Sequence, residues 1–586
     1  MLVIGGSSLI GLAAACAAPS PAAPTSPPAS QANAPQPTSG AAAQATTATS
    51  ATAAPASATN APASATTAPA AATAAPAAAA TAAPSPGGTV TLPIGADPTL
   101  NPWHPNAFVE SIFPNRVLFG GLAKPGKDLN PAPDLAAAWK AAEDGMSWTF
   151  TLRDNVTWSD GQAFTADDVG YTFNQVVLKP DAGANGRGNF SAVKDVTAVD
   201  PKTVTFNLSR PFAALPSYLA YNAGILPKHV FENAGDPWQL NSFNKGTPVS
   251  TGPFKVESFT PGQSVVLTRN DAYYAGKPAL DKLVFKVVAD ANTQIAQGLS
   301  GELQIMILDN KAAVDRLKGA KGLSVQPRTL VQYYWLALNQ TDARFQDVRV
   351  RQAIEYAIDR NAIIQAVEKG YGTVANSPIV PALKAYYDSS LENRYPYDAA
   401  KAASLLTEAG WSAGPDGTLM KDGQPFSFTM DVGQRGVLEP TNELIQQNLQ
   451  KVGIHVDLNS MEWNSYIQKV VVNRDYTATV NWWVYPNDPD VLPYYASSAA
   501  GKGFNIPGYK DQALDDLLTA GQKTSDPTQR KPIYTQLQAY MADNLPYNFL
   551  WYPQEIDVVS DNLQGVPDLN LRDAMHYVNE WSLKKA

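Results

Sequence analysis

No Asp, Glu, Lys or Arg occurs in this 586-residue chain before Asp97. Residues 17–86 contain only Ala, Pro, Thr, Ser, Gln, Asn and Gly. Such a segment has no large apolar side chains for a core, so burial cannot offset the loss of chain entropy on folding. Recurring prolines also interrupt the helix that alanine would favour. The sequence therefore predicts a disordered tether over residues 16–87 and a folded protein from residue 88 onward.

Residues 1–15, MLVIGGSSLIGLAAA, are apolar and end in small residues directly before Cys16. This pattern is typical of a bacterial signal peptide that precedes a lipidated cysteine. No basic residue begins the segment, and Ala13 stands where lipoprotein signals usually have leucine. A plain secretory signal, cut elsewhere with loss of Cys16, is the alternative. We expect a lipidated Cys16 that anchors an extracytoplasmic protein to the bacterial cell membrane, in the periplasmic space or at the outer face of the envelope.

Composition excludes several classes of protein. A net charge of −9, from 43 basic and 52 acidic residues, argues against a nucleic-acid-binding protein, which needs a basic surface for phosphates. No apolar stretch after residue 15 is long enough for a transmembrane helix. A single cysteine excludes an intrachain disulfide and a cysteine-based zinc site. We expect no cofactor and no metal, because the four histidines have no ligand spacing: His104, His229, His455 and His576.

The chain after residue 87 has the patterns of ordinary strands and helices. Val90, Leu92 and Ile94 alternate with other residues, which predicts a half-buried strand. Thr165 is followed three residues later by Asp168, and this spacing is typical of a helix start in which the acid caps the first turn. The mass of 62.4 kDa is too large for one core and predicts two or three structural units.

A second helix start is predicted at Asp347. Val350, Ile354 and Ile358 then recur at helical spacing and would lie on one apolar face. The basic residues of this segment are expected to be mostly solvated: Arg349, Arg351 and Arg360.

Several separated segments together resemble the extracellular solute-binding proteins of family 5, the peptide and nickel receptors of ABC importers. The resemblance spans essentially all of residues 88–586, in the order of the family. Its segments are Leu135–Phe173, Ser250–Phe254, Arg269–Tyr274, Asp347–Arg360 and Tyr397–Trp411.

The resemblance implies an α/β, two-lobed periplasmic-binding-protein fold of type II, similar to cluster C. An extra subdomain would lie on the first lobe, and two crossing strands near Tyr333–Asn339 and Leu545–Tyr552 would form the hinge. It further implies a monomer that is not an enzyme, that encloses a ligand between its lobes, and that delivers it to an ABC permease with its ATPase. The implied lobe boundaries are about 88–130, 245–335 and 545–586 for lobe I, 131–244 for the subdomain, and 336–544 for lobe II.

The resemblance also implies where the ligand lies. Peptide-binding relatives line the cleft with two tryptophans, and Trp463 and Trp482 match their positions. Aromatic faces offer large, rigid contact area at low entropic cost. The side chain of Trp483 is expected either to line the cleft or to lie in the hydrophobic core, and the sequence does not favour one position over the other. The aromatic cluster that includes Tyr334 would suit sugar stacking as well as apolar peptide side chains.

One position departs from the family pattern. Peptide-binding relatives carry an aspartate three residues after the second tryptophan, where it holds the peptide ammonium group, but this chain has Tyr485. A neutral phenol accepts a hydrogen bond without the charge assistance of a carboxylate. Asp488 or Glu110 could supply the missing charge, so we expect ligand contacts from Tyr485 and Asp488.

The sequence leaves the ligand open. The main hypothesis is a receptor for di- or oligopeptides; the alternative is a receptor for a neutral oligosaccharide or another non-peptide solute. Nickel fits less well, because no histidine falls between Trp482 and Asp490. A secreted carbohydrate-active enzyme and a sensor are more distant hypotheses, since no GxSxG, HExxH or Cys–His motif of a hydrolase occurs.

Overall fold

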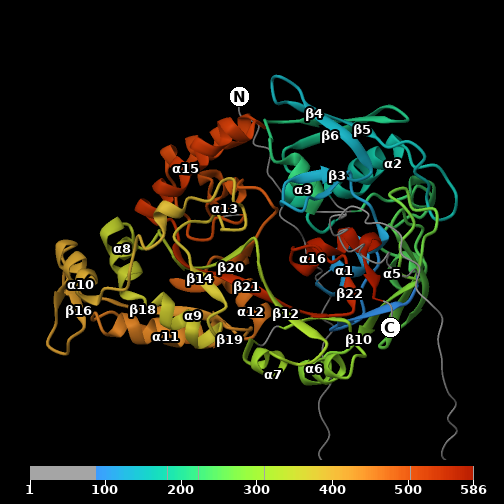
Figure 1. The fold of residues 1–586 in the computed structure, drawn as a ribbon. Coiled ribbons are helices and arrows are strands. Elements are labelled where there is room, and N and C mark those ends of the chain that lie inside the picture. Colours follow the sequence, from blue (N-terminus) through green and yellow to red (C-terminus); the bar gives the residue numbers. More distant parts are fainter. Residues whose placement is uncertain are drawn as a thin grey trace, which may run out of the picture. The chain divides into compact units, whose positions relative to one another are not determined.

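The computed structural model describes residues 87–584, except residues 108, 181–182, 222–223, 309–310 and 502. The predicted signal peptide, Cys16 and most of the tether therefore lie outside the described residues. Within the described part the chain alternates helices and sheets (Figure 1). None of the helices described there combines the length and the apolarity that a membrane span requires.

The first sheet contains the predicted strand with Val90, Leu92 and Ile94. This strand, β1 (Thr89–Ile94), runs parallel to β10 (Lys282–Val287), which pairs with β9 (Ser264–Arg269) and then β8 (Phe254–Thr260). All three apolar side chains are buried, as the alternation predicts.

A second, antiparallel sheet has the order β4-β5-β7-β6. Helix α2 (Ala166–Tyr171) packs against it and begins where predicted: the carboxylate of Asp168 accepts a hydrogen bond from the backbone N–H of Thr165 at 2.9 Å. The same carboxylate accepts the indole N–H of Trp158 at 3.3 Å. The strands are β4 (Ala136–Ala141), β5 (Ser147–Leu152), β6 (Val193–Asp200) and β7 (Thr203–Leu208).

The largest sheet has the order β11-β21-β13-β20-β18-β19, with β12 and β14 also paired to β21. The long strand β21 (Asn548–Ser560) pairs through its first residues with β13 and β14, and through its last residues with β11 and β12. The other strands are β11 (Ile305–Ile307), β12 (Leu323–Thr329), β13 (Gln332–Leu338), β14 (Gly372–Val374), β18 (Ser427–Gly433), β19 (His455–Met461) and β20 (Ala478–Val484).

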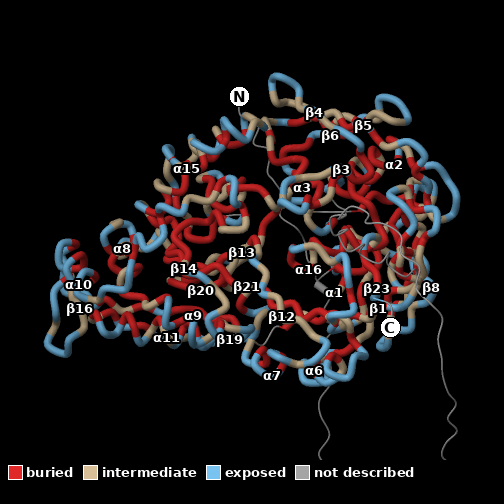
Figure 2. The backbone as a smooth tube through the Cα atoms, in the orientation of Figure 1, coloured by how far each residue is buried: buried red, intermediate tan, exposed pale blue. Residues whose placement is uncertain are grey.

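The buried residues, red in Figure 2, form separate clusters, and the first and last residues of β21 belong to different ones. Two clusters draw on residues 90–317 and on 556–581, and two others on residues 331–552. We call these parts the first half (residues 87–329 and 554–584) and the second half (residues 330–553). The chain passes between the halves only from β12 to β13 and along β21, so these are the two crossing strands. Separate cores joined by continuous strands permit hinge motion.

Helices cover the sheets of both halves. In Figure 1, α8 to α11 gather on one side of β21, and α1 and α16 lie on the other. The helices of eight or more described residues are α1 (Val109–Leu118), α6 (Ala291–Leu299), α8 (Val348–Ala357), α9 (Arg360–Val367), α10 (Ala399–Glu408), α11 (Leu438–Gln450), α14 (Gln512–Lys523) and α15 (Pro527–Asn544). Shorter ones near the site are α3 (Leu215–Tyr221), α12 (Trp463–Tyr466), α13 (Leu492–Tyr495) and α16 (Leu571–Ala574).

Helix α8 begins as predicted, because the carboxylate of Asp347 accepts the backbone N–H of Arg349 at 2.9 Å. The expectation that the arginines of this segment are mostly solvated is wrong for two of them, Arg351 in α8 and Arg360 at the start of α9. Arg351 is buried and donates to the carbonyl groups that end α15, including Asn544 O at 2.7 Å. Arg360 is buried in an ion pair with Glu355 at 2.7 Å. Partners distant in sequence satisfy both guanidinium groups, so these can leave water.

Candidate ligand-binding site

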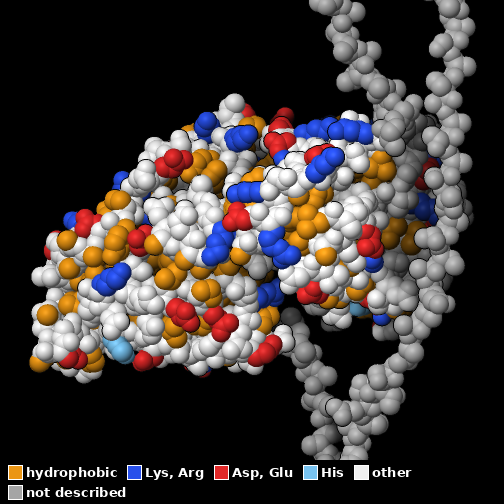
Figure 3. Space-filling model, turned by 60° about the horizontal axis from the view of Figure 1, so that its bottom comes forward, with side chains coloured by type: hydrophobic (Ala, Val, Ile, Leu, Met, Phe, Trp, Pro, Cys, Tyr) orange, Lys and Arg blue, Asp and Glu red, His pale blue; other side chains and the backbone are white. Residues whose placement is uncertain are grey.

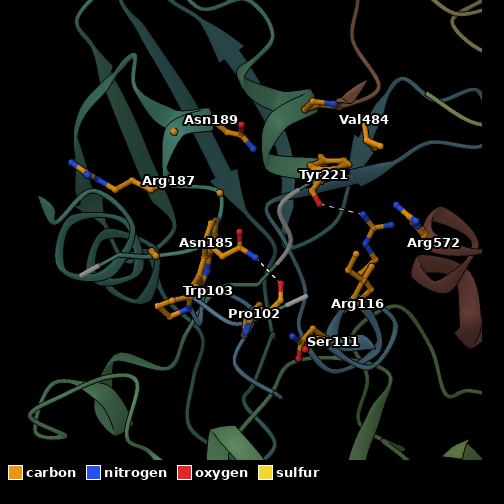
Figure 4. A pocket seen from close by; sticks show the side chains of 18 of the residues that line it. Pro102, Trp103, Ser111, Arg116, Asn185, Arg187, Asn189, Tyr221, Val484 and Arg572 are labelled. Carbon is orange, nitrogen blue, oxygen red and sulfur yellow. Dashed lines mark hydrogen bonds between the residues drawn. The ribbon is translucent and has the colours of Figure 1, made fainter. Parts of the chain in front are cut away.

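A cavity of about 620 Å³ lies where the two halves meet. The first half contributes a loop and the start of α1 within residues 102–116, the loop at residues 183–189, Tyr221 and Arg572 (Figure 4). The second half contributes the end of β20 and the segment that follows: Trp483, Val484, Pro486, Tyr494 and Phe504. Because both halves supply walls, a change in their relative position would open or close this space.

Aromatic rings form the wall from the second half. The ring of Trp483 lies 5.1 Å from that of Tyr494 and 5.5 Å from that of Phe504, and the last two stack at 5.4 Å. The hydroxyl of Tyr494 donates to the carbonyl of Val484 at 3.3 Å, which fixes the ring at the end of β20. The structure thus places the predicted residue Trp483 at the cavity, within a wall suited to apolar contact.

The charged side chains that line the cavity are basic. They are Arg116, Arg187 and Arg572, and no Asp or Glu occurs among the described lining residues. Arg116 is buried, and its guanidinium forms an ion pair with Asp573 at 3.0 Å. The other oxygen of Asp573 accepts the side-chain N–H of Asn487, at 3.2 Å, from the second half. This carboxylate therefore joins a cavity arginine to the opposite half.

Tyr485 lies in the core of the second half and does not line the cavity. Its side chain is 1% exposed, and its hydroxyl donates to the carbonyl of Pro378 at 2.5 Å. Burial raises the pKa of this phenol well above its ordinary value, so it stays neutral. Glu110 is also absent from the cavity lining. Ligand contact by Tyr485 stays a prediction that this geometry does not favour.

Asp488 is already paired within the protein. Its two carboxylate oxygens accept hydrogen bonds from Arg530 at 2.7 and 2.9 Å, and the hydroxyl of Ser217 donates to it at 3.3 Å. Ser217 belongs to the first half, so the carboxylate also bridges the halves. A ligand ammonium at Asp488 would have to compete with a buried bidentate guanidinium. The predicted role of Asp488 as an ammonium anchor is untested, and its partners oppose it.

The other predicted aromatic residues gather on the opposite face of β20 from Trp483, because successive side chains of a strand alternate. The rings of Trp463 and Trp482 stack at 5.5 Å with an angle of 15° between their planes. Tyr334 lies 5.8 Å from Trp482, and the guanidinium of Arg435 lies 4.9 Å above Trp463. All are at least partly accessible, but none lines the cavity. We call this group the tryptophan stack.

Comparison with known proteins decides the family. The model of the family described as "Bacterial extracellular solute-binding proteins, family 5 Middle" matches residues 130–504. The chain is 31% identical over 509 residues to the oligopeptide-binding protein AppA of Bacillus subtilis (strain 168), covering 86% of this chain and 93% of that protein. The chain belongs to family 5 of the extracellular solute-binding proteins.

Other similarities agree with this membership of family 5. The dipeptide-binding protein of Escherichia coli (strain K12) is 29% identical over 462 residues, which cover 74% of this chain and 83% of that protein. The structure of B. subtilis AppA in complex with a nonapeptide superimposes with a TM-score of 0.71 at 29% identity, covering 86% of this chain and 100% of AppA. The predicted two-lobed α/β fold is therefore confirmed.

The residues that sequence reasoning missed come from the first half of this family 5 protein. Arg116 and Arg572 are far apart in sequence, and only the fold brings them to one cavity. Neither belongs to a recognisable motif. The one available signal was that Arg572 follows the second crossing strand closely, and such a position is near the place where the halves meet.

Proposed function

We propose that this protein captures a short peptide in the cavity between its halves and delivers it to an ABC permease coupled to an ATPase. The observation that carries the proposal is a cavity with an aromatic wall from one half and a polar, arginine-containing wall from the other. Apolar walls with a few placed polar groups are the usual form of a small-ligand site, and 620 Å³ falls in the usual size range. The named relatives that bind oligopeptides and dipeptides support the same ligand class.

Capture would proceed by closure about the crossing strands. Contacts between the halves include the hydrogen bond from Ser217 to Asp488, the ion pair of Lys311 with Glu368 and the hydrogen bond from Asn487 to Asp573. Opening would break them, so a ligand that touches both halves would favour the closed form by its differential affinity. We propose lobe boundaries close to those expected from the sequence, with the passages between the halves at residues 329–330 and 553–554.

A neutral solute such as an oligosaccharide is the second candidate. The absence of Asp and Glu from the described cavity lining favours it. Rings such as Trp483 also stack well on sugars. Binding either class of ligand requires no catalytic residue, and we propose that the protein binds its ligand without converting it.

The location proposed is extracytoplasmic, as the family description states for its members. We propose that a lipid on Cys16 anchors the chain to the cell membrane and that residues 17–86 act as a tether. We also propose a monomer. Charged and apolar side chains intermingle over the face shown in Figure 3, without a continuous apolar surface there, and this supports the monomer.

Thermal unfolding of the full chain against di- to hexapeptides and against malto- and cello-oligosaccharides tests the proposed ligand. A ligand at a hundred times its Kd should add about 2.7 kcal/mol to the free energy of unfolding, which raises the Tm measurably. We expect peptides to raise the Tm and sugars to leave it unchanged. Stabilisation by sugars alone would replace the peptide proposal with the second candidate.

Two matched variants locate the ligand in this assay. Trp483→Ala should remove most of the peptide-induced rise in Tm, because it removes the centre of the aromatic wall. Trp463→Ala removes a ring of the same kind from the tryptophan stack. If Trp463→Ala also removes the peptide-induced rise in Tm, the ligand also contacts the tryptophan stack, as the sequence predicts.

A further inference from the structure

Two arginine side chains meet at one end of the cavity. Arg116, from α1, and Arg572, from α16, place their guanidinium groups side by side next to Tyr221 (Figure 4). Arg187 extends toward the other end and is separate from this pair. Since two guanidinium groups repel each other, such a pair is stable only where negative charge is near.

The first of these arginines is held rigidly. The guanidinium of Arg116 binds Asp573 at 3.0 Å and donates to the carbonyl of Tyr221 at 3.4 Å. Asp573 also accepts the side-chain N–H groups of Asn487 and Asn570. Arg116 is thus a fixed positive group whose counter-charge, Asp573, is not among the residues that line the cavity.

Arg572 is less fully satisfied. Its Nε is buried and has no hydrogen-bond acceptor among the described residues. The carboxylates of Glu555 and Asp557, on one face of β21, attract it. Burial raises the pKa of both carboxyl groups, and the neighbouring Glu555 carboxylate raises that of Asp557 further, so the two hold less than two negative charges at neutral pH. The guanidinium of Arg572 can therefore still bind an anion in the cavity.

We propose that this end of the cavity binds a carboxylate of the ligand, with Arg572 as the contact and Arg116 as the fixed neighbouring charge. The inference deepens the proposed function: the ligand would be an anionic peptide, recognised through its C-terminal carboxylate or an acidic side chain. A guanidinium presents paired N–H donors that match a carboxylate. A ligand ammonium would find no described carboxylate in the lining, so N-acetylation should matter little.

The experiment uses a library of random tetrapeptides prepared as free acids, as C-terminal amides and as N-acetylated free acids. Equimolar mixtures are incubated with the full chain, and the retained peptides are quantified by mass spectrometry after gel filtration. We expect free acids and N-acetylated acids to be retained about 10- to 100-fold more than amides, the usual range for a charge-assisted contact. If the retained amides are enriched in Asp and Glu, the site recognises acidic side chains. If they are not enriched, the site recognises the C-terminal carboxylate.

The variant Arg572→Gln should remove the preference for acids, and Arg572→Lys should retain part of it. Arg316→Gln, an exposed arginine of the first half, is the matched control and should keep the full preference. Equal retention of acids and amides by the unaltered chain overturns the inference while leaving peptide capture intact, and this comparison needs no variant.

A minimal probe separates failure of the inference from failure of the proposed function. N-acetylglycine and N-acetylglycinamide differ in the carboxylate but resemble each other in size. If no tetrapeptide is retained, but N-acetylglycine raises the Tm of the unaltered chain and not that of Arg572→Gln, the carboxylate site stands without peptide capture. If N-acetylglycine also has no effect, both proposals fall.

Discussion

Replacing Arg530 with methionine should lower the free energy of unfolding by about 3–5 kcal/mol, because a buried carboxylate would lose the guanidinium group that pairs with it. The guanidinium of Arg530 binds both oxygens of Asp488, and the two side chains are only 5% and 7% exposed. Asp490 lies close by and is also buried, so the remaining cluster would hold two carboxyl groups without a counter-ion. Urea unfolding followed by circular dichroism measures the change.

The matched control is Arg394→Met. Arg394 pairs with Asp543, but both side chains are about half exposed, and an exposed pair contributes at most about 1 kcal/mol. Combining Arg530→Met with Asp488→Asn should recover part of the lost stability, since the uncompensated charge is then removed. Equal losses for Arg530→Met and Arg394→Met would contradict the assignment of Asp488 as a buried, internally paired carboxylate.

The second large effect is on pH dependence. Burial, followed by the neighbouring Glu555 carboxylate, raises the pKa of Asp557 to about 9, against an ordinary value of 3.8. Between these two pH values the folded protein holds a proton that the unfolded chain has released. Stability should therefore fall as the pH rises, by up to about 1.4 kcal/mol per pH unit. Asp557→Asn removes the titrating group and should flatten this dependence, leaving the variant more stable than the unaltered protein at pH 8.

The range from pH 8 to 9 isolates this effect. Burial raises the pKa of Asp490 to about 6 and that of Glu355 to about 7, so both carboxyl groups are largely ionised in the folded protein at pH 8. Burial also lowers the pKa of His576, which affects stability only at more acidic pH. Asp457→Asn, at an exposed carboxylate, is the control. Identical slopes for Asp557→Asn and the unaltered chain would show that Asp557 is ionised in the folded state.

Local structure was predictable from the sequence because its causes are local. The alternation of apolar residues in the sequence at Val90, Leu92 and Ile94 is the alternation that buries these side chains in the sheet. The carboxylates of Asp168 and Asp347 cap helix starts through hydrogen bonds to residues two or three positions away. The environment of an arginine depends instead on residues far along the chain. The guanidinium of Arg351 donates to the carbonyl groups of residues 544 and 545, and no sequence pattern near residue 351 predicts these partners.

The site was predictable only in part for the same reason. Trp482 and Trp483 are adjacent, so strand alternation requires that they lie on opposite faces, but the sequence does not say which face borders the cavity. The missing family aspartate at Tyr485 was visible, whereas the pairing of Asp488 with Arg530 was not. Arg116 and Asp573 are 457 residues apart, and only the fold unites them.

The central claim is that a peptide lies in the cavity between the halves. A crystal structure of the full chain grown with the most strongly stabilising free-acid peptide tests it most directly. We predict peptide density against the rings of Trp483 and Tyr494, with a carboxylate at Arg572. Peptide density at another surface, with this cavity empty, would contradict the account.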